Sequence, residues 1–388
     1  MAVDSFPMKK EGLVYLDSAA TTLKPTCVID AVRDFYSKEY GTVHRAIYDL
    51  SMNATTQYDA VRSKVQKFLN AQDSCEIIFT SGTTESINLV AHSFGEAFIQ
   101  KGDVILVTEL EHHSNIVPWQ LLCERTGAQI KVIPATEDGE LDLNAYAELL
   151  TDQVKLVSVA HISNAIGTIH PIEKIIKMAH AMGAKVLIDG AQAAPHLHID
   201  VRALDADFYA FSGHKVYGPT GVGVLYGKRE LLEAMPPFMG GGDMIKTVSF
   251  SKTTFADLPM KFEAGTPPIA EVIGLGAALD FLERQKPVTL QNLLLDRLSR
   301  LDKVKIIGRP ANRGPIVSFV VDGLHPLDIG TMLNLKGIAI RTGHHCAQPA
   351  MEHFCIQGCA RASLGVYNTE DEIEYFTRSL ESVIKKLC

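Results

Sequence analysis

Between residues 15 and 227, short apolar runs alternate with stretches whose apolar residues recur at helical spacing. Strands that are apolar on both faces and alternate with helices are typical of a mainly parallel, doubly wound sheet. The sequence therefore predicts an α/β fold for this part of the chain. The expected strands are Ile77–Thr80, Val104–Thr108, Ile130–Pro134, Leu156–Ala160, Val186–Asp189, Phe208–Phe211 and Val222–Tyr226, and the clearest helices are Ile87–Ala97, Val117–Thr126 and Ile172–Met182.

A different pattern follows. Residues 236–268 are rich in glycine and proline, which is typical of loops and of a domain boundary. Beyond them we expect strands at Ile316–Val321 and Ile338–Arg341. A capping box at Thr369–Glu372 opens a last helix that runs towards Lys386. These elements indicate a second, smaller α+β unit.

A length of 388 residues is enough for two domains with a large core. We expect a large domain over residues 15–264 and a small domain over residues 265–388. Residues 1–14 are expected to belong to the small domain. The net charge of −8, without a long basic run, argues against a nucleic-acid partner. No apolar stretch has the length of a membrane span, no secretory signal is evident, and the seven cysteines are too widely spaced for a disulfide framework. These features predict a cytoplasmic protein with no membrane partner.

Two expected strands end in residues that suit one cofactor. Val186–Asp189 ends in a carboxylate, and Phe208–Phe211 is followed by Ser212, Gly213, His214 and Lys215. A lysine just past a buried strand end is poorly solvated, so its amine shifts towards the neutral, nucleophilic form that a Schiff base needs. Pyridoxal 5'-phosphate (PLP) requires a carboxylate at its pyridine nitrogen and an amine at its aldehyde. Either residue alone is better read as structural; together they favour PLP.

Two further segments fit the same cofactor. Gly82–Thr84 follows a strand and opens a helix, which is typical of an anion-binding site or of an ordinary helix cap. With Ser212 and His214 it forms a candidate phosphate cup. The pair His112–His113 could bind a metal, stack on a ring or be structural. Because adjacent side chains point in different directions, we expect one histidine to face the site and to stack on the pyridine.

The segment Arg341–Cys346 is the second strong signal. A cysteine flanked by histidines after an arginine lies in electropositive surroundings, which favour its thiolate. The alternatives are a buried small hydrophobe or a zinc site with His344, His345, Cys355 and Cys359, although the spacing of the last two is not that of a zinc finger. Farther on, Arg361 could clamp a substrate carboxylate or form a salt bridge between domains.

These segments resemble the class V aminotransferase family of fold-type I PLP enzymes. More narrowly, the chain is similar to the group II cysteine desulfurases of the SufS type, nearly from end to end. The motifs that carry the resemblance are His44-Arg45, Gly82–Glu85, Glu111–Trp119, Asp189–Gln192, Ser212–Lys215, Phe262–Thr266 and Arg341–Cys346.

The resemblance implies a role for each site residue. The catalytic residues are Lys215, which binds the cofactor covalently, Cys346, which takes the sulfur, and His112, which stacks on the ring. The cofactor-binding residues are Thr83, Thr84, His112, Asp189, Gln192, Ser212, His214, Lys215 and, from the partner subunit of a homodimer, Thr266. The substrate-binding residues are His44, Arg45, Asn164, Arg341 and Arg361, and no metal is expected.

The activity that the resemblance implies is removal of sulfur from L-cysteine, giving L-alanine and a persulfide on Cys346. The sulfur would pass to a SufE-like acceptor protein and supply iron–sulfur cluster assembly. A selenocysteine lyase, or another PLP lyase of the same family, is the alternative enzyme. A sulfur carrier or zinc scaffold that has lost PLP is the non-enzyme alternative.

Overall fold

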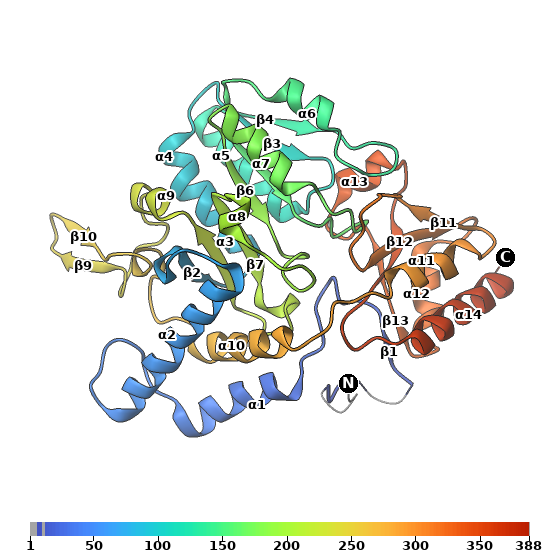
Figure 1. The fold of residues 1–388 in the computed structure, drawn as a ribbon, viewed down its shortest axis with the longest axis horizontal. Coiled ribbons are helices and arrows are strands. Elements are labelled where there is room, and N and C mark those ends of the chain that lie inside the picture. Colours follow the sequence, from blue (N-terminus) through green and yellow to red (C-terminus); the bar gives the residue numbers. More distant parts are fainter. Residues whose placement is uncertain (1–5, 10–11, 388) are drawn as a thin grey trace.

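A sheet of seven strands lies at the centre of the computed structural model, which describes residues 6–9 and 12–387 (Figure 1). The strand order is β2-β8-β7-β6-β5-β3-β4, so the sheet is not built in chain order. Strands β7, β6, β5, β3 and β4 run parallel, whereas β8 runs antiparallel to its neighbours β7 and β2. The strands are β2 (Ile77–Thr80), β3 (Val104–Thr108), β4 (Gln129–Ile133), β5 (Val154–Ala160), β6 (Lys185–Asp189), β7 (Phe208–Ser212) and β8 (Gly223–Gly227).

The predicted mainly parallel α/β sheet is confirmed, and each of its strands lies within two residues of the expected range. Both faces are buried, because alternate side chains of the strands pack into two separate cores. Helices α2, α6, α7 and α10 cover one face, and α3, α5 and α9 cover the other. Their bounds are α2 (Asp49–Leu69), α3 (Thr83–Val90), α5 (Val117–Thr126), α6 (Leu143–Leu149), α7 (Ile172–Ala181), α9 (Arg229–Ala234) and α10 (Ile269–Glu283).

A second, antiparallel sheet lies towards the C-terminus, in the order β11-β12-β15-β14 (Figure 1). Helices α11, α12 and α14 pack on it around a core of its own. The expected strand at residues 338–341 is two short strands, because β13 pairs with the N-terminal β1 while β14 pairs with β15. The elements are β1 (Val14–Tyr15), β11 (Val304–Ile307), β12 (Ile316–Val321), β13 (Ile338–Ala339), β14 (Arg341–Gly343), β15 (Cys359–Ser363), α11 (Gln291–Ser299), α12 (Pro326–Asn334), α13 (Gln348–His353) and α14 (Glu370–Leu387).

The segment between the two sheets bears on the predicted division at residue 265. Helix α10 follows that position, yet Ile269, Val272, Leu275 and Leu279 are buried in the core of the large sheet. Helix α10 also packs against α1 (Thr26–Asp34) and α2. We therefore propose that the large unit extends through α10 to about residue 284, and that the N-terminal residues belong with the small sheet.

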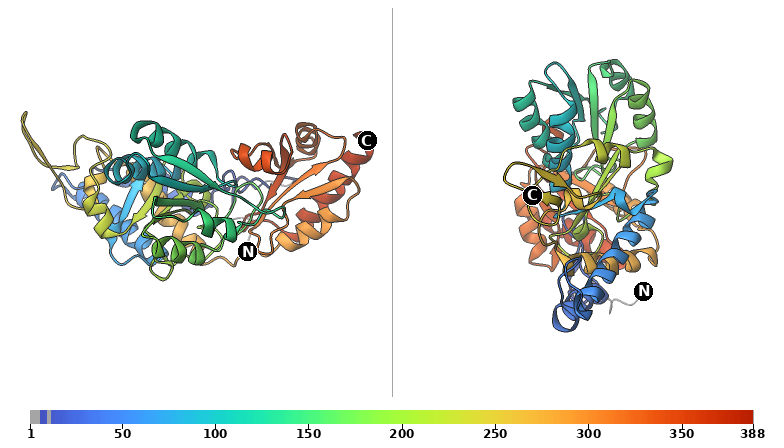
Figure 2. Two further views of the ribbon diagram at one scale, coloured as in Figure 1. Left: turned by 90° about the horizontal axis from the view of Figure 1, so that it is seen from above. Right: turned by 90° about the vertical axis from the view of Figure 1, so that its left-hand side faces the viewer.

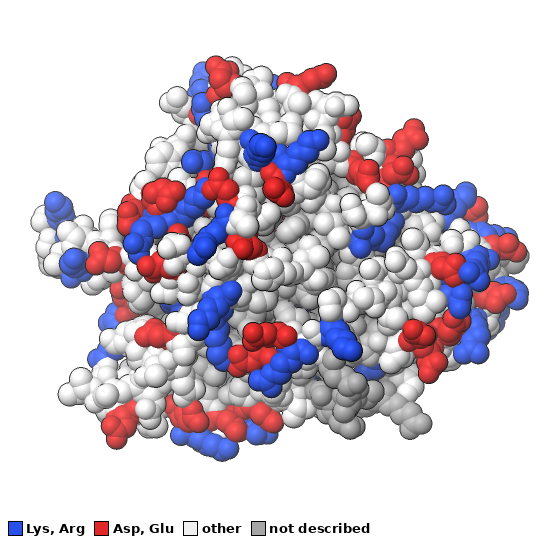
Figure 3. All heavy atoms as spheres, viewed as in Figure 1, with Lys and Arg blue, Asp and Glu red and all other residues white. Residues whose placement is uncertain are grey.

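The outside of the molecule has two notable features. The hairpin of β9 (Ile245–Val248) and β10 (Thr253–Phe255) projects from the large unit (Figure 2). On the face shown in Figure 3, basic and acidic side chains are interspersed, without a broad area of one sign. Within the described residues, no helix combines the length and the apolar character that crossing a bilayer requires.

Candidate active site

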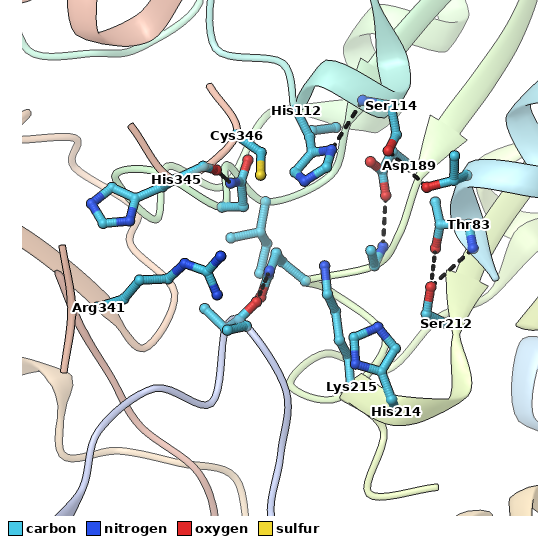
Figure 4. Close-up of a pocket in the computed structure, with 18 of the residues that line it drawn as sticks. Thr83, His112, Ser114, Asp189, Ser212, His214, Lys215, Arg341, His345 and Cys346 are labelled. Atoms are coloured by element: carbon cyan, nitrogen blue, oxygen red, sulfur yellow. Dashed lines mark hydrogen bonds between the residues drawn. The ribbon is translucent and has the colours of Figure 1, made fainter. Parts of the chain in front are cut away.

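A cavity lies beyond the carboxyl ends of β5, β6 and β7, where ligands of doubly wound sheets usually bind (Figure 4). The small sheet closes it on one side through β14, β15 and the loop after β14. Twelve of the predicted site residues line this cavity: Thr83, Thr84, His112, Asn164, Asp189, Gln192, Ser212, His214, Lys215, Arg341, Cys346 and Arg361.

Asp189 and Lys215 share the cavity as expected, because their parallel strands end at the same edge of the sheet. Asp189 is buried, and one of its carboxylate oxygens accepts a hydrogen bond from the Ala191 amide at 2.9 Å. Burial raises the pKa of Asp189, and the Lys215 ammonium opposes that rise. Burial likewise lowers the pKa of Lys215, against the pull of the Asp189 carboxylate. The pair thus offers a buried carboxylate and an amine that is readily deprotonated.

The end of the cavity near Ser212 is built to hold an anion. The Ser212 hydroxyl lies 2.9 Å from the Thr83 amide and 2.8 Å from the Thr83 hydroxyl, and Thr84 Oγ1 lies 2.7 Å from Ser114 Oγ. These groups surround the first turn of α3, where helix amides favour negative charge. Gly223 permits this closeness, because a Cβ atom there would lie 2.4 Å from the Gly82 Cα.

His112 has a defined protonation state. Its Nδ1 atom accepts a hydrogen bond from the Ser114 amide at 3.0 Å, so the neutral ring carries its proton on Nε2. Burial, reinforced by the Lys215 charge, lowers the pKa of His112 to about 3. The ring is therefore neutral at physiological pH. Of the two adjacent histidines, only His112 lines the cavity; His113 Nε2 instead accepts from the Gln348 amide at 3.0 Å.

An N-terminal segment, residues 21–24, holds the backbone that presents Lys215. The carbonyl oxygen of His214 accepts hydrogen bonds from the Lys24 ammonium at 2.8 Å and from the Thr22 amide and hydroxyl, each at 3.1 Å. His214 Nδ1 lies 3.1 Å from the Thr21 hydroxyl, and burial lowers the pKa of His214 to about 4. Its ring is therefore an uncharged neighbour of the phosphate cup.

Cys346 reaches the cavity on a strained loop. His345 and Cys346 have φ angles of 53° and 55°, which place two successive non-glycine residues in the left-handed region. Hydrogen bonds hold this conformation: the Asn164 side-chain amide donates to the His345 carbonyl at 2.6 Å, and the His113 amide donates to the Cys346 carbonyl at 2.8 Å. The loop turns the exposed Cys346 thiol towards the cavity while His345 points away (Figure 4).

Two of the candidate zinc ligands, His345 and Cys359, lie against each other. His345 is buried, and its Nε2 atom lies 3.2 Å from both the carbonyl oxygen and the sulfur of Cys359. Burial lowers the pKa of His345 to about 3. Over residues 6–9 and 12–387, no three His, Cys, Asp or Glu side chains are grouped so that they could hold a metal ion.

The arginines lie side by side across β14 and β15, since Arg341 and Arg361 are register partners. Arg361 is buried and donates to the Asn164 carbonyl at 2.7 Å and to Asp17 at 3.2 Å, while its Nε–H has no partner in the described part of the chain. Arg341 lies 4.0 Å from the other oxygen of Asp17. One carboxylate therefore faces two guanidinium groups, which leaves positive charge to receive a substrate carboxylate.

Three predicted site residues lie elsewhere on this chain. His44 binds Asp59 at 3.0 Å, Arg45 is paired with Asp243, and Thr266 is exposed. None of them lines the cavity. The Gly265 amide donates to the Gly242 carbonyl, next to Asp243, so this second group is gathered on one surface. Their assignment as site residues stays a prediction that depends on a second subunit.

Some residues of the site were not foreseen. Ser114 lines the cavity, and its amide holds the His112 ring in one orientation. Its position two residues after His112 was the only feature of the sequence that could have indicated this role. Asp17 and Lys24 had no signal, because their partners Arg361 and His214 lie far along the chain.

The donors and acceptors of the cavity fit PLP: an amine, a buried carboxylate, a neutral ring and an anion cup are all present.

The aminotransferase class-V family model matches residues 14–376. A probable cysteine desulfurase of Vibrio cholerae is 48% identical over 97% of this chain and 94% of its own length. The crystal structure of an Escherichia coli cysteine desulfurase superposes with a TM-score of 0.93 at 41% identity, covering 99% of this chain and 98% of that one. The structure of a cysteine desulfurase from Thermococcus onnurineus superposes with a TM-score of 0.94 at 39% identity, covering 99% of this chain and 97% of that one. The chain belongs to the aminotransferase class-V family.

Proposed function

We propose that this protein is a PLP-dependent cysteine desulfurase. The observation that carries the proposal is a single cavity that joins Lys215 and Asp189, at two strand ends, to an accessible cysteine, Cys346, from the small sheet. The relatives named above are described as cysteine desulfurases, and they match nearly the full length of this chain, which supports the same activity here.

The cofactor would be held by residues that the cavity already gathers. Lys215 would bind its aldehyde, Asp189 would pair with its ring nitrogen, and His112 would cover the ring. Ser212 and the first turn of α3 would hold its phosphate, with Gln192 beside the ring oxygen. When bound, PLP supplies an electron-withdrawing ring that makes the Cα–H bond of an amino acid acidic.

The substrate is positioned by the opposite wall. The guanidinium of Arg361 and the side-chain amide of Asn164 bind the carboxylate of L-cysteine, and Arg341 adds positive charge. Once the amine of the substrate has replaced it at the cofactor, the Lys215 amine takes the proton from Cα, and burial, which lowers the pKa of Lys215, favours the neutral form that this needs. The neutral ring of His112 can donate a hydrogen bond into the cavity only from Nε2, because Nδ1 already accepts one from the Ser114 amide.

Sulfur transfer takes place at Cys346. Its thiolate attacks the sulfur of bound cysteine: an S–S bond forms, the Cβ–S bond breaks, and the electron pair of that bond stays with carbon. A proton added to that carbon completes alanine, so one cysteine and one enzyme thiol yield one alanine and one persulfide. No external oxidant or reductant is required.

The test is to incubate the purified protein with L-cysteine and to measure alanine and protein-bound persulfide together. We expect equal amounts in the first turnover, with the persulfide on Cys346. Pyruvate and free sulfide in place of alanine would instead indicate a lyase. A preference for selenocysteine, with turnover independent of Cys346, would favour the selenocysteine lyase.

We further propose that the protein works as a homodimer whose sites are completed by the partner subunit. The support is a run of exposed apolar side chains directly after Arg45. Ile47 is 94% exposed, and Tyr48, Leu50 and Met52 are also exposed; apolar side chains gathered in one segment mark an interaction surface. Burying this segment against a second copy would bring His44, Arg45 and Thr266 towards the site of the partner subunit.

Light scattering tests the dimer. The substitution Ile47→Asp is expected to shift the protein towards monomer and to weaken its retention of PLP. The control is Leu335→Asp, at another apolar position after α12 that is 74% exposed, which we expect to leave both unchanged. A wild-type monomer with full PLP occupancy would contradict the proposal.

The physiological setting is a further proposal from the resemblance. We infer a cytoplasmic enzyme that supplies iron–sulfur cluster assembly through a SufE-like acceptor. The short tether of Cys346 to β14 supports a partner that comes to the mouth of the cavity. Alanine formation at fixed reductant, with and without the acceptor, tests this; no stimulation would contradict it.

A further inference from the structure

A buried carboxylate that the proposed reaction does not use lies directly before His112. Glu111 is fully buried three residues after the end of β3. Its Oε1 atom accepts hydrogen bonds from the Thr108 hydroxyl at 2.7 Å and from the Ala160 amide at 3.0 Å, and its Oε2 atom accepts from the Asn115 side-chain amide at 2.7 Å. Glu111 therefore joins the ends of two neighbouring strands to the turn that follows His112.

The direction of these hydrogen bonds is fixed. The Trp119 indole can only donate, and it donates to Asn115 Oδ1 at 3.1 Å, where the Ser158 hydroxyl also donates at 2.5 Å. Asn115 Oδ1 must therefore face Trp119, and its NH2 group must face Glu111. Since the Ala160 amide is also only a donor, the side chain at position 111 has to accept at both ends. A carboxylate does so and an amide does not.

This network borders the site at two points. Ala160 lines the cavity and is the register partner of Asp189 in the sheet. His112 follows Glu111 in the chain, and the turn that Asn115 closes contains Ser114, whose amide holds the His112 ring. A change in the Glu111 hydrogen bonds would therefore move the ring of His112 relative to the carboxylate of Asp189.

We propose that Glu111 is a positioning residue that sets the spacing between His112 and Asp189 through its hydrogen bonds to Ala160 and Asn115. This inference rests on the proposed function, because it deepens the account of the same site. Burial raises the pKa of Glu111 to about 7, whereas its three donors favour the carboxylate. Measurements at pH 8 therefore keep the wild-type network in its accepting form.

The first variant is Glu111→Gln, which keeps the size of the side chain. In one orientation its NH2 group meets the NH2 group of Asn115; in the other it meets the Ala160 amide. Either way a buried donor loses its acceptor, which is costly. We expect kcat to fall roughly ten- to hundredfold, with KM for cysteine changed less than about threefold, because Glu111 does not touch the carboxylate-binding residues. The circular dichroism band of bound PLP should also change, since it reports the tilt of the ring.

The matched variant is the exchange Glu111→Gln with Asn115→Asp. The introduced glutamine then accepts from Thr108 and Ala160 and donates to the introduced aspartate, which in turn accepts from Trp119 and Ser158. The buried charge and the number of acceptors are conserved, so we expect kcat and the dichroism band to return to within about threefold of wild type. Thermal unfolding is measured alongside, because a merely stabilising role would move the melting temperature and leave kcat per loaded site and the dichroism band unchanged.

Two outcomes would overturn the proposal. One is a folded, PLP-loaded Glu111→Gln variant with wild-type kcat and dichroism; the other is a loss of kcat that the exchange does not recover. If Glu111→Gln does not fold, Thr108→Val takes its place, since it removes one donor to Oε1 and keeps the β-branched shape; unchanged kcat and dichroism would again overturn the proposal. Failure of the proposed function looks different: the wild type itself would then form no alanine, while the dichroism comparison could still be made.

Discussion

The two ends of the cavity are built differently. The cofactor end, formed by Thr83, Asp189, Ser212 and Lys215, lies at the tips of buried strands and on the first turn of a helix, and side-chain hydrogen bonds hold it. The sulfur end is one loop carrying an exposed cysteine in the left-handed region, and hydrogen bonds to its backbone carbonyls hold it.

The difference corresponds to two chemical needs. Proton transfer at Cα benefits from a dry site and fixed geometry, where burial shifts the pKa of both Asp189 and Lys215. A cysteine that must receive sulfur and hand it on has to remain accessible. The two ends should therefore fail independently, and substitutions at each test this separation.

The largest effect is expected at the cofactor end. Lys215→Ala removes the amine that binds PLP and moves the Cα proton, so alanine formation should fall by roughly 10³-fold or more. Borohydride should no longer trap PLP on the protein, while alkylation of Cys346 by iodoacetamide should stay within about twofold of wild type. A borohydride-trapped cofactor on the variant would show that another lysine holds it.

Cys346→Ser is the reciprocal change and the next in size. It should reduce alanine formation from cysteine by roughly 10²-fold or more, with the absorbance spectrum of bound PLP unchanged. Cys355→Ser is the control, because Cys355 is another exposed cysteine of the same region and does not line the cavity. Full alanine formation by Cys346→Ser would remove the sulfur end from the reaction.

A smaller effect is expected from Ser212→Ala. Ser212 organises Thr83 at the anion cup, so the Kd of PLP should rise roughly tenfold, with kcat at saturating PLP close to wild type. Ser93→Ala is the control, since Ser93 is buried and its hydroxyl has no hydrogen-bond partner in the described residues. Equal changes in both variants would mean that the cup is not specific.

The smallest effect concerns pH. The pKa of His345 is about 3 in the folded protein and about 6.5 when unfolded. The unfolded state therefore binds the proton that the folded state refuses, and stability falls as pH drops below 6.5. At pH 5.5 this costs about 1.4 kcal/mol. His345→Gln keeps a donor for the Cys359 carbonyl and removes the titrating ring.

The measurement is the melting temperature at pH 7.5 and pH 5.5. The decrease between the two should be about 2 °C smaller in His345→Gln than in wild type. Because the ring points away from the cavity, kcat at pH 7.5 should change little. An identical decrease in both proteins would place the acid sensitivity elsewhere, for example in His112 or His214 at the other end.

The sequence predicted the cofactor end better than the sulfur end, for a physical reason. Apolar runs locate strands, and parallel strands end at one edge, so Asp189 and Lys215 could be expected on the same side of the sheet. The conformation of the Cys346 loop depends on Asn164 and His113, which are distant in sequence, so no local pattern carries it. The roles of individual residues came from the family resemblance.

Long-range pairing explains the other differences. The place of β8 between β2 and β7 and the packing of α10 on the large sheet depend on contacts that periodicity does not encode. The Glu111 network is not predicted by the sequence for a related reason. An acidic residue after a strand is typical of a loop, and only the fold brings the donors at Thr108, Asn115 and Ala160 around Glu111.

The order of the two sheets along the chain has a consequence for synthesis. All strands of the large sheet have left the ribosome once residue 227 has emerged, and Cys346 follows 119 residues later in the chain. At about 5–20 residues per second, that interval is roughly 6–24 s. The strands whose ends carry Asp189 and Lys215 can therefore pair while Cys346, the thiol that takes sulfur, is still untranslated.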